Sequence, residues 1–418
     1  MNMRSWAWWT LAVLVLALIV AVSWLTPWHR PPAPRADQLA ALRSLPTAEV
    51  SRGREFAAAL RPSRYGSMAL GLLVACLLGC TPLGARIVTA VAKPWGGAWL
   101  AQVLLGGLVL VLVADVLTLP LQAWRQQILV RYGLSTQGWS GWAIDLAKGY
   151  AVGAVIGAVV LVGFFGLVRL SPQRWWIWGA LGAALLTILL SFVLPVLIEP
   201  VFNTFTPMPA GPLRTELIAM ADRDRVPVKD VLVADASRRT KAVNAYVSGF
   251  GPTRRIVVYD TLLSQAPESE VVSVVAHELG HAKYRDVLAS TLVGALGAAI
   301  AVIALYLAGG WAPLLRAAGT PSIGDPRALG LILALTAVFG LVAAPAQALL
   351  SRQVEARADA HALALTNDPD GFAAMQHRLS SLNLADPDPP RLEYIWFASH
   401  PSTVERIAFA RAYARGLR

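Results

Sequence analysis

Two histidines and a glutamate near the middle of the chain have the types and spacing of a metal-dependent hydrolytic site. Residues 277–281 read His-Glu-Leu-Gly-His, so His277 and His281 are four residues apart. On a helix, residues at this spacing share one face and can bind one Zn²⁺, while the glutamate between them can take a proton from a zinc-bound water. The pattern therefore predicts a hydrolase in which Glu278 is the general base.

The residues before this motif predict that it lies on a helix. Glu268 and Glu270 suit a first turn, because negative side chains interact favourably with the positive end of a helix dipole. Val271, Val275 and Leu279 follow at helical spacing and form an apolar stripe. The stripe predicts that one side of this helix is buried, while the two histidines project from another.

A catalytic zinc needs a third protein ligand and keeps one position for water. The extended motif HExxHxxGxxH is excluded, because Tyr284 and Val287 occupy the places of its glycine and third histidine. Glu355 and His361 are the remaining candidates. Two apolar segments separate them from the motif, and an even number of membrane crossings returns the chain to the side on which the motif lies. Asp359, one turn after Glu355, is a candidate hydrogen-bond partner for a ligand histidine.

Long apolar segments dominate the rest of the chain. Of the 418 residues, 56% are hydrophobic and 15% are charged, whereas soluble domains have about 25% charged residues. Several segments reach the roughly 20 apolar residues that a membrane-spanning helix needs. The sequence therefore predicts a mainly α-helical, multi-pass membrane protein with seven spans, at residues 6–25, 68–90, 98–121, 149–168, 176–197, 287–308 and 329–350.

Basic residues predict how the chain is oriented in the membrane. Residues 29–65 carry seven arginines, and cytoplasmic loops are enriched in such residues. Alternation then places residues 199–286 and 351–418 in the cytoplasm and the N-terminus outside. The net charge of +11 fits this rule. Because no nucleic-acid-binding motif accompanies it, we expect no nucleic-acid partner.

Several segments resemble one protease family. HELGH at 277–281 and SRQVEARAD at 351–359 match the zinc-site motifs of the M48 metalloproteases, in particular the membrane-bound CAAX prenyl proteases of type 1. Residues 198–207, 244–251 and 255–263 are also similar to that family. The resemblance covers most of the chain.

The resemblance implies an architecture. It consists of about seven transmembrane helices that enclose a chamber, with a zincin-like (gluzincin) α+β domain on the cytoplasmic side. Residues 1–65 would form a first span and basic linker, and residues 66–207 an N-terminal membrane domain of four spans. Residues 208–418 would form the M48 peptidase domain, including the spans at 287–308 and 329–350.

The resemblance also implies roles for individual side chains. The family's ligands for one Zn²⁺ per chain correspond to His277, His281 and Glu355, which favours Glu355 over His361, and its base corresponds to Glu278.

Two residues near the C-terminal end match further positions of the family. Its C-terminal histidine and arginine correspond to His400 and Arg406. A donor such as His400 would stabilise the oxyanion that forms when water attacks a peptide carbonyl. Arg406 would orient that donor or hold a carboxylate.

Asn244, Ala245 and Tyr246 match the family's segment before the zinc helix, and we expect these three residues to bind substrate. Asn244 suits a hydrogen bond to substrate backbone, although it also suits an ordinary polar turn. Residues 256–259 are β-branched and aromatic, which predicts a strand whose edge a substrate could join.

Together these features predict a zinc-dependent membrane endopeptidase for a peptide or protein substrate, possibly with a lipidated or C-terminal segment. The alternatives are a quality-control M48 protease of the heat-shock type without a prenylated substrate, and a non-enzymatic membrane scaffold. A site-2-type intramembrane protease is disfavoured, because Lys283, Arg285 and Asp286 follow the motif directly. Compact loops and a tail without an endoplasmic-reticulum retention signal favour a bacterial cell membrane.

Overall fold

The computed structural model describes residues 2–28, 33–249 and 251–416; Arg30 of the basic linker and Phe250 lie outside them. Within these ranges seven helices are long and apolar enough to cross a membrane, which confirms the predicted number. They are α1 (Met3–Leu25), α3 (Thr47–Cys80), α5 (Trp99–Arg131), α6 (Trp139–Leu170), α7 (Trp175–Phe202), α11 (Asp286–Ala308) and α13 (Leu329–Thr366).

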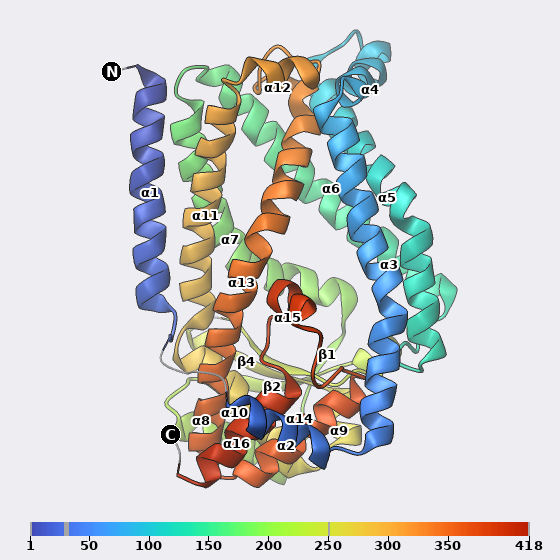
Figure 1. Ribbon diagram of the computed structural model, residues 1–418, viewed down its shortest axis with the longest axis vertical. Coiled ribbons are helices and arrows are strands. Elements are labelled where there is room, and N and C mark those ends of the chain that lie inside the picture. Colours follow the sequence, from blue (N-terminus) through green and yellow to red (C-terminus); the bar gives the residue numbers. More distant parts are fainter. Residues whose placement is uncertain (1, 29–32, 250, 417–418) are drawn as a thin grey trace.

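The long helices run along the longest axis of the molecule, and the shorter elements gather mainly at its two ends (Figure 1). The end of the molecule at which the N-terminus lies also holds α4 (Leu83–Ala92) and α12 (Ala312–Ala317). The other end holds a sheet, most of the short helices and the C-terminus. Helix α11 leads away from this domain and α13 leads back to it. The chamber expected between the long helices stays a prediction.

The second span differs from its prediction. One helix was expected over residues 68–90, but α3 ends at Cys80 and α4 begins at Leu83. Pro82 accounts for the break, because the proline ring disfavours the α region for the residue before it. Thr81 accordingly has φ −128° and ψ 165°. Beyond this break, the chain continues at the end of the molecule rather than through the bundle.

Two segments are more helical than expected. The basic linker contains α2 (Arg35–Ser44) and the first half of α3. Glu355 lies inside α13, which continues without interruption beyond the last predicted span, residues 329–350. Between Pro345 and Asn367 the sequence contains no glycine or proline and many alanines, so nothing ends the helix there. Asn367 ends it with a left-handed conformation, φ 50°.

The end domain contains a four-stranded sheet in the order β1-β2-β4-β3. Its strands are β1 (Phe205–Pro207), β2 (Asp230–Ala234), β3 (Ala245–Ser248) and β4 (Arg255–Tyr259). The prediction that residues 256–259 form a strand is confirmed, but the prediction that they form an edge is wrong. Strand β4 pairs with β2 on one side and β3 on the other, so it is an interior strand and the two edge strands are β1 and β3.

Helix α10 (Glu268–Lys283) lies at the centre of this domain. Its apolar stripe is buried as predicted, with Val271, Val275 and Leu279 at most 1% exposed. The surrounding helices are α8 (Pro212–Arg223), α9 (Asp260–Gln265), α14 (Pro369–Leu382), α15 (Arg391–Phe397) and α16 (Thr403–Ala414).

Glycines allow α3 and α13 to pack closely. A Cβ at Gly79 of α3 would overlap the carbonyl oxygen of Gly330 in α13, and a Cβ at Gly330 would overlap that of Leu78. Small residues at such crossings let backbones approach in the membrane, where van der Waals packing drives helix association. The contact holds the first turn of α13 against α3.

Candidate metal centre

Helices α10 and α13 bring the candidate ligands together. His277, Glu278 and His281 lie on α10, and Glu355 lies on α13. The two helices cross at Gly280, where an added Cβ would lie 3.2 Å from Cβ of His361 and 3.3 Å from the Cα of residue 358. A side chain at position 280 would press against α13 there. The glycine of the motif thus keeps the carboxylate within reach of the histidines.

The three side chains are arranged as a tetrahedral zinc site requires. Nε2 of His277 lies 3.2 Å from Nε2 of His281 and 3.2 Å from Oε2 of Glu355. Nε2 of His281 lies 3.5 Å from Oε1 of the same carboxylate. Ligand atoms about 2.1 Å from a tetrahedral zinc lie roughly 3.4 Å from one another. The separations match that geometry, and these residues fit the ion.

Glu355 also has the environment of a metal ligand. Its Oε2 is buried and accepts no hydrogen bond from the described residues. A buried carboxylate oxygen without a donor is unfavourable unless a cation compensates it. The set of two imidazoles and one carboxylate, with a fourth position open, is the donor set of catalytic zinc hydrolases.

His361, the alternative ligand, points elsewhere. Its Nε2 lies 2.9 Å from Oδ2 of Asp224, whose other oxygen accepts a bond from Lys283. In the part of the chain that the structure describes, one His/Cys/Asp/Glu group has metal-site geometry, and it contains Glu355 and not His361. The arrangement therefore favours Glu355.

Asp359 and Arg406 support His277 from behind. Oδ1 of Asp359 lies 2.9 Å from Nδ1 of His277, as predicted for a carboxylate partner of a ligand. Arg406 binds Asp359 through Nε, at 2.8 Å, and through its terminal nitrogen. Arg406 thus holds a carboxylate, which was one of the two tasks predicted for it. Burial lowers the pKa of His277, but the nearby carboxylates of Asp359 and Glu355 outweigh it and raise the pKa to about 10.

His400 lies at the mouth of the site. Its Nε2 is 3.4 Å from Oε2 of Glu355, and its Nδ1 is 2.8 Å from the hydroxyl of Ser399. The following helix begins with a capping box in which Ser402 and Glu405 satisfy each other's backbone donors, which fixes the loop. Desolvation in the cleft lowers the pKa of His400, so its ring is neutral at pH 7 and can donate one hydrogen bond.

A cleft of about 770 Å³ opens beside the ligands. His277, Glu278, Asn244 and His400 all line it. Burial raises the pKa of Glu278, although the neighbouring histidines oppose this shift. A higher pKa brings this carboxylate closer to neutral pH, where a general base is most effective.

The three residues predicted to bind substrate have different positions. Asn244 lines the cleft. Ala245 is 1% exposed and belongs to the core, so only its backbone is available to a ligand. The ring of Tyr246 packs edge to face against that of Tyr259, with 6.3 Å between the ring centres. Burial raises the pKa of the Tyr246 hydroxyl. Of the three side chains, that of Asn244 has the predicted access to the cleft.

Asp286 is a site residue that the sequence reasoning missed. Its Oδ2 lies 2.8 Å from Nδ1 of His281, and Arg357 binds its other oxygen. Arg285 before it has φ 56°, a left-handed turn that directs the start of α11 back toward the site. The sequence signal was an acidic residue five positions after His281. Asp286 does for His281 what Asp359 does for His277.

The substitution Asp286→Asn is therefore expected to weaken zinc binding about 10- to 100-fold, because partners of ligand histidines have effects of this size. Competition with a chromophoric chelator measures the change. Asp222→Asn, at an exposed position of the same domain, is the matched control. Equal zinc affinity in both variants would contradict the role of Asp286.

Two family models match adjoining parts of the chain. The model of peptidase family M48 matches residues 207–414. The model described as CAAX prenyl protease N-terminal, five membrane helices, matches residues 64–204, which hold the second half of α3 and all of α4 to α7. The two matches meet where the membrane helices give way to the sheet.

Curated relatives and a solved structure agree with these matches. The uncharacterized metalloprotease YhfN of Bacillus subtilis is 31% identical over 72% of this chain and 71% of its own length. A CAAX prenyl protease 1 homolog of Arabidopsis thaliana is 32% identical over 66% of this chain and 65% of its own length. The crystal structure of S. mikatae Ste24p shares the fold, with a TM-score of 0.76 over 98% of this chain and 97% of that chain, at 21% identity. The chain therefore belongs to peptidase family M48 and is a membrane-embedded metalloprotease of that family.

Proposed function

We propose that this protein is a zinc-dependent endopeptidase whose ion is held by His277, His281 and Glu355. The observation that carries the proposal is the convergence of these three ligand atoms, all within 4.8 Å of one another, beside a glutamate in an open cleft. When bound, zinc would lower the pKa of a coordinated water to about 7 and polarise the substrate carbonyl.

The protein's own groups supply the remaining chemistry. Glu278 accepts a proton from the attacking water and returns it to the departing amine. His400 donates a hydrogen bond to the oxyanion, for which its position at the cleft mouth is suitable. Arg406 and Asp359 hold His277 in the tautomer that leaves Nε2 free for the metal. The reaction needs no covalent intermediate with the protein.

Strand β3 supports substrate binding in an extended conformation. It is an edge strand, so one row of its backbone groups is free of partners within the described sheet. Asn244, directly before it, lines the cleft. An extended peptide that pairs with such an edge acquires main-chain hydrogen bonds while side-chain pockets provide specificity. We therefore assign the pairing with an extended substrate to residues 244–248 instead of residues 256–259.

The substrate class follows from the relatives. CAAX prenyl protease 1 homologs suggest a peptide or protein with a C-terminal or lipidated segment, which a chamber between the spans would admit from the bilayer. The arginines of the linker support a cytoplasmic position for the catalytic domain, and the similarity to YhfN supports a bacterial cell membrane. A heat-shock-type quality-control protease, without a prenyl requirement, is the second candidate.

Peptide cleavage by detergent-purified protein tests the proposal. Two peptides are compared that differ only in a prenyl group on a cysteine near the C-terminus, each with and without a chelator. We expect cleavage that the chelator abolishes and that added Zn²⁺ restores, with faster turnover of the prenylated peptide. Equal turnover of both peptides would favour the quality-control candidate. Cleavage that persists after complete zinc removal would contradict the metalloprotease mechanism.

A further inference from the structure

The loop between α14 and α15, residues 383–390, forms part of the cleft wall and also supports the start of α16. Asp386 and Pro389 of this loop line the cleft. The carbonyl oxygen of Pro387 accepts a hydrogen bond of 3.2 Å from the backbone N–H of Val404, which lies in the first turn of α16. A shift of the loop would therefore shift the start of this helix.

The start of α16 is connected in turn to His400, the proposed oxyanion donor. His400 lies in the short segment between α15 and α16, and Glu405 fixes the end of that segment. Oε2 of Glu405 accepts one hydrogen bond from the backbone N–H of Ser402 and another from the hydroxyl of Tyr394, each 2.7 Å long. Because these contacts join the segment to the helix, a shift of the helix start would move His400 within the cleft.

Arg35, the first residue of α2, holds the loop from the side of the linker. Its two terminal nitrogens donate to the two carboxylate oxygens of Asp388, at 2.8 and 2.6 Å. A third bond, 3.0 Å long, joins Arg35 to Oε1 of Gln38, which is 8% exposed. A single exposed ion pair stabilises little, but a bidentate pair of arginine and carboxylate fixes both the distance and the direction of its members. Arg35 thus determines where Asp388 lies.

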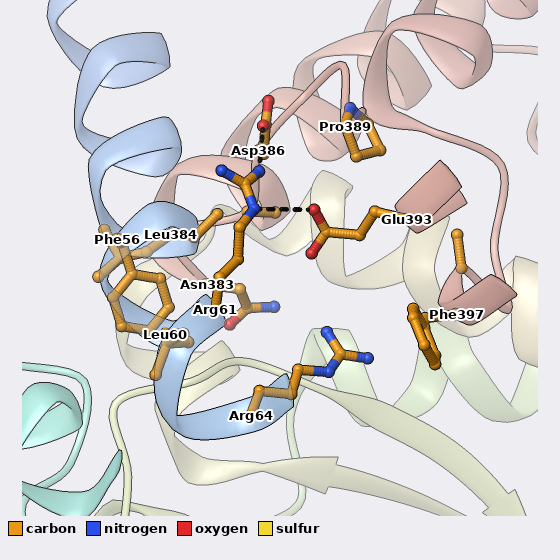
Figure 2. Close-up of a pocket in the computed structure, with 13 residues that line it drawn as sticks. Phe56, Leu60, Arg61, Arg64, Asn383, Leu384, Asp386, Pro389, Glu393 and Phe397 are labelled. Carbon is orange, nitrogen blue, oxygen red and sulfur yellow. Dashed lines mark hydrogen bonds and ion pairs between the residues drawn. The ribbon is translucent and has the colours of Figure 1, made fainter. Parts of the chain in front are cut away.

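Further arginines hold the same loop from α3. Nε of Arg61 donates to Glu393 of α15 at 3.0 Å, and the guanidinium of Arg61 lies 3.9 Å from the carboxylate of Asp386 (Figure 2). Arg54 lies 3.7 Å from the same carboxylate. The arginines of the linker therefore have a task besides the orientation of the chain in the membrane, because they hold the loop between α2 and α3.

Helix α2 also packs directly on α16. Ala41 of α2 and both Val404 and Ala408 of α16 belong to one apolar cluster, and each of the three is 0% exposed. With 3.6 residues per turn, Arg406 projects from the opposite side of α16, where it binds Asp359. Helix α16 is thus held between α2 on one side and the support of the zinc site on the other.

We propose that Arg35 is a positioning residue for His400, which it holds in place through Asp388 and the start of α16. The inference rests on the proposed peptidase function and adds to it the linker, which does not itself line the cleft. A donor to the oxyanion acts on the transition state and not on the bound substrate. Loss of the positioning contact therefore lowers kcat and leaves KM unchanged.

Steady-state cleavage of the prenylated peptide by the full-length purified protein tests the inference. We expect Arg35→Gln to lower kcat about three- to tenfold, which is part of the roughly 10²- to 10³-fold loss that removal of an oxyanion donor causes. KM and zinc content stay at their wild-type values. Arg35→Lys restores part of the loss, and Arg35→Asp combined with Asp388→Arg is more active than Arg35→Asp alone. The matched control is Arg43→Gln, which removes the same charge from an exposed position of α2 and retains wild-type kcat.

The same substitution in a His400→Ala background separates positioning from general stabilisation. His400→Ala lowers kcat by itself, and adding Arg35→Gln has no further effect, because two residues that act through one another are not additive. An equal loss in both backgrounds would overturn the proposal, since Arg35 would then act independently of His400. Wild-type kcat in Arg35→Gln, or a rise in KM alone, would also overturn it. Failure of wild type to cleave the peptide would instead contradict the peptidase function.

Discussion

Glu278→Gln is expected to lower kcat for peptide cleavage about 10²- to 10⁴-fold, the range of a positioned general base. Glutamine has nearly the same shape but cannot accept the proton from water. Zinc content should stay at one ion per chain, because His277, His281 and Glu355 are untouched. Single-turnover kinetics together with elemental analysis of the same preparation measure both quantities.

Glu270→Gln serves as the control for this substitution. Glu270 lies on the same helix but is 6% exposed and binds Arg378, away from the ligands. Its variant should retain zinc and turnover if it folds, which the thermal unfolding midpoint checks. Wild-type turnover by Glu278→Gln would remove this residue from the mechanism. Loss of zinc from the Glu278→Gln variant would show that Glu278 contributes to zinc binding rather than to proton transfer.

Glu355→Ala is expected to lose zinc at a chelator concentration that wild type withstands. The variant has two imidazoles and no negative ligand, so its zinc affinity should fall by more than the 10- to 100-fold that an indirect partner causes. His361→Ala is the companion variant, because His361 lies further along α13 and binds Asp224 instead. Retained zinc in Glu355→Ala, with loss in His361→Ala, would reverse the ligand assignment.

The sequence was sufficient for features that depend on local pattern or on counting. The HExxH spacing requires only one helix, and α10 forms it with the expected buried stripe. The seven spans follow from composition, because a bilayer admits long apolar helices whatever they pack against. Parity of the spans placed Glu355 on the side of His281, and the two side chains lie 3.5 Å apart.

The sequence was insufficient where packing between distant segments decides. The break after Cys80 was readable in Pro82, but apolar content was the stronger signal and hid it. Strand order cannot be read from residues 256–259 alone, because an interior strand and an edge strand with one buried face can both be β-branched. In the structure Ile256, Val257 and Val258 are all buried, as expected for a strand in the interior of a sheet that is covered on both faces.

Partners of the site show the same limit. Asp286 is held beside His281 by Arg357, which lies 71 residues later in the sequence and binds the other oxygen of the carboxylate. Likewise, Arg64 of α3 lies with its guanidinium 5.2 Å from the centre of the Phe397 ring of α15, although the two residues are far apart in the sequence. No short window of sequence contains both members of either pair.

The central claim is that one zinc ion is bound by two histidines of α10 and a glutamate of α13. Anomalous diffraction from crystals of the protein, collected on both sides of the zinc absorption edge, tests it most directly. The account predicts a single peak per chain, about 2.0 to 2.2 Å from Nε2 of His277, Nε2 of His281 and an oxygen of Glu355. A peak beside His361 and Asp224, or none in protein that cleaves peptide, would contradict it.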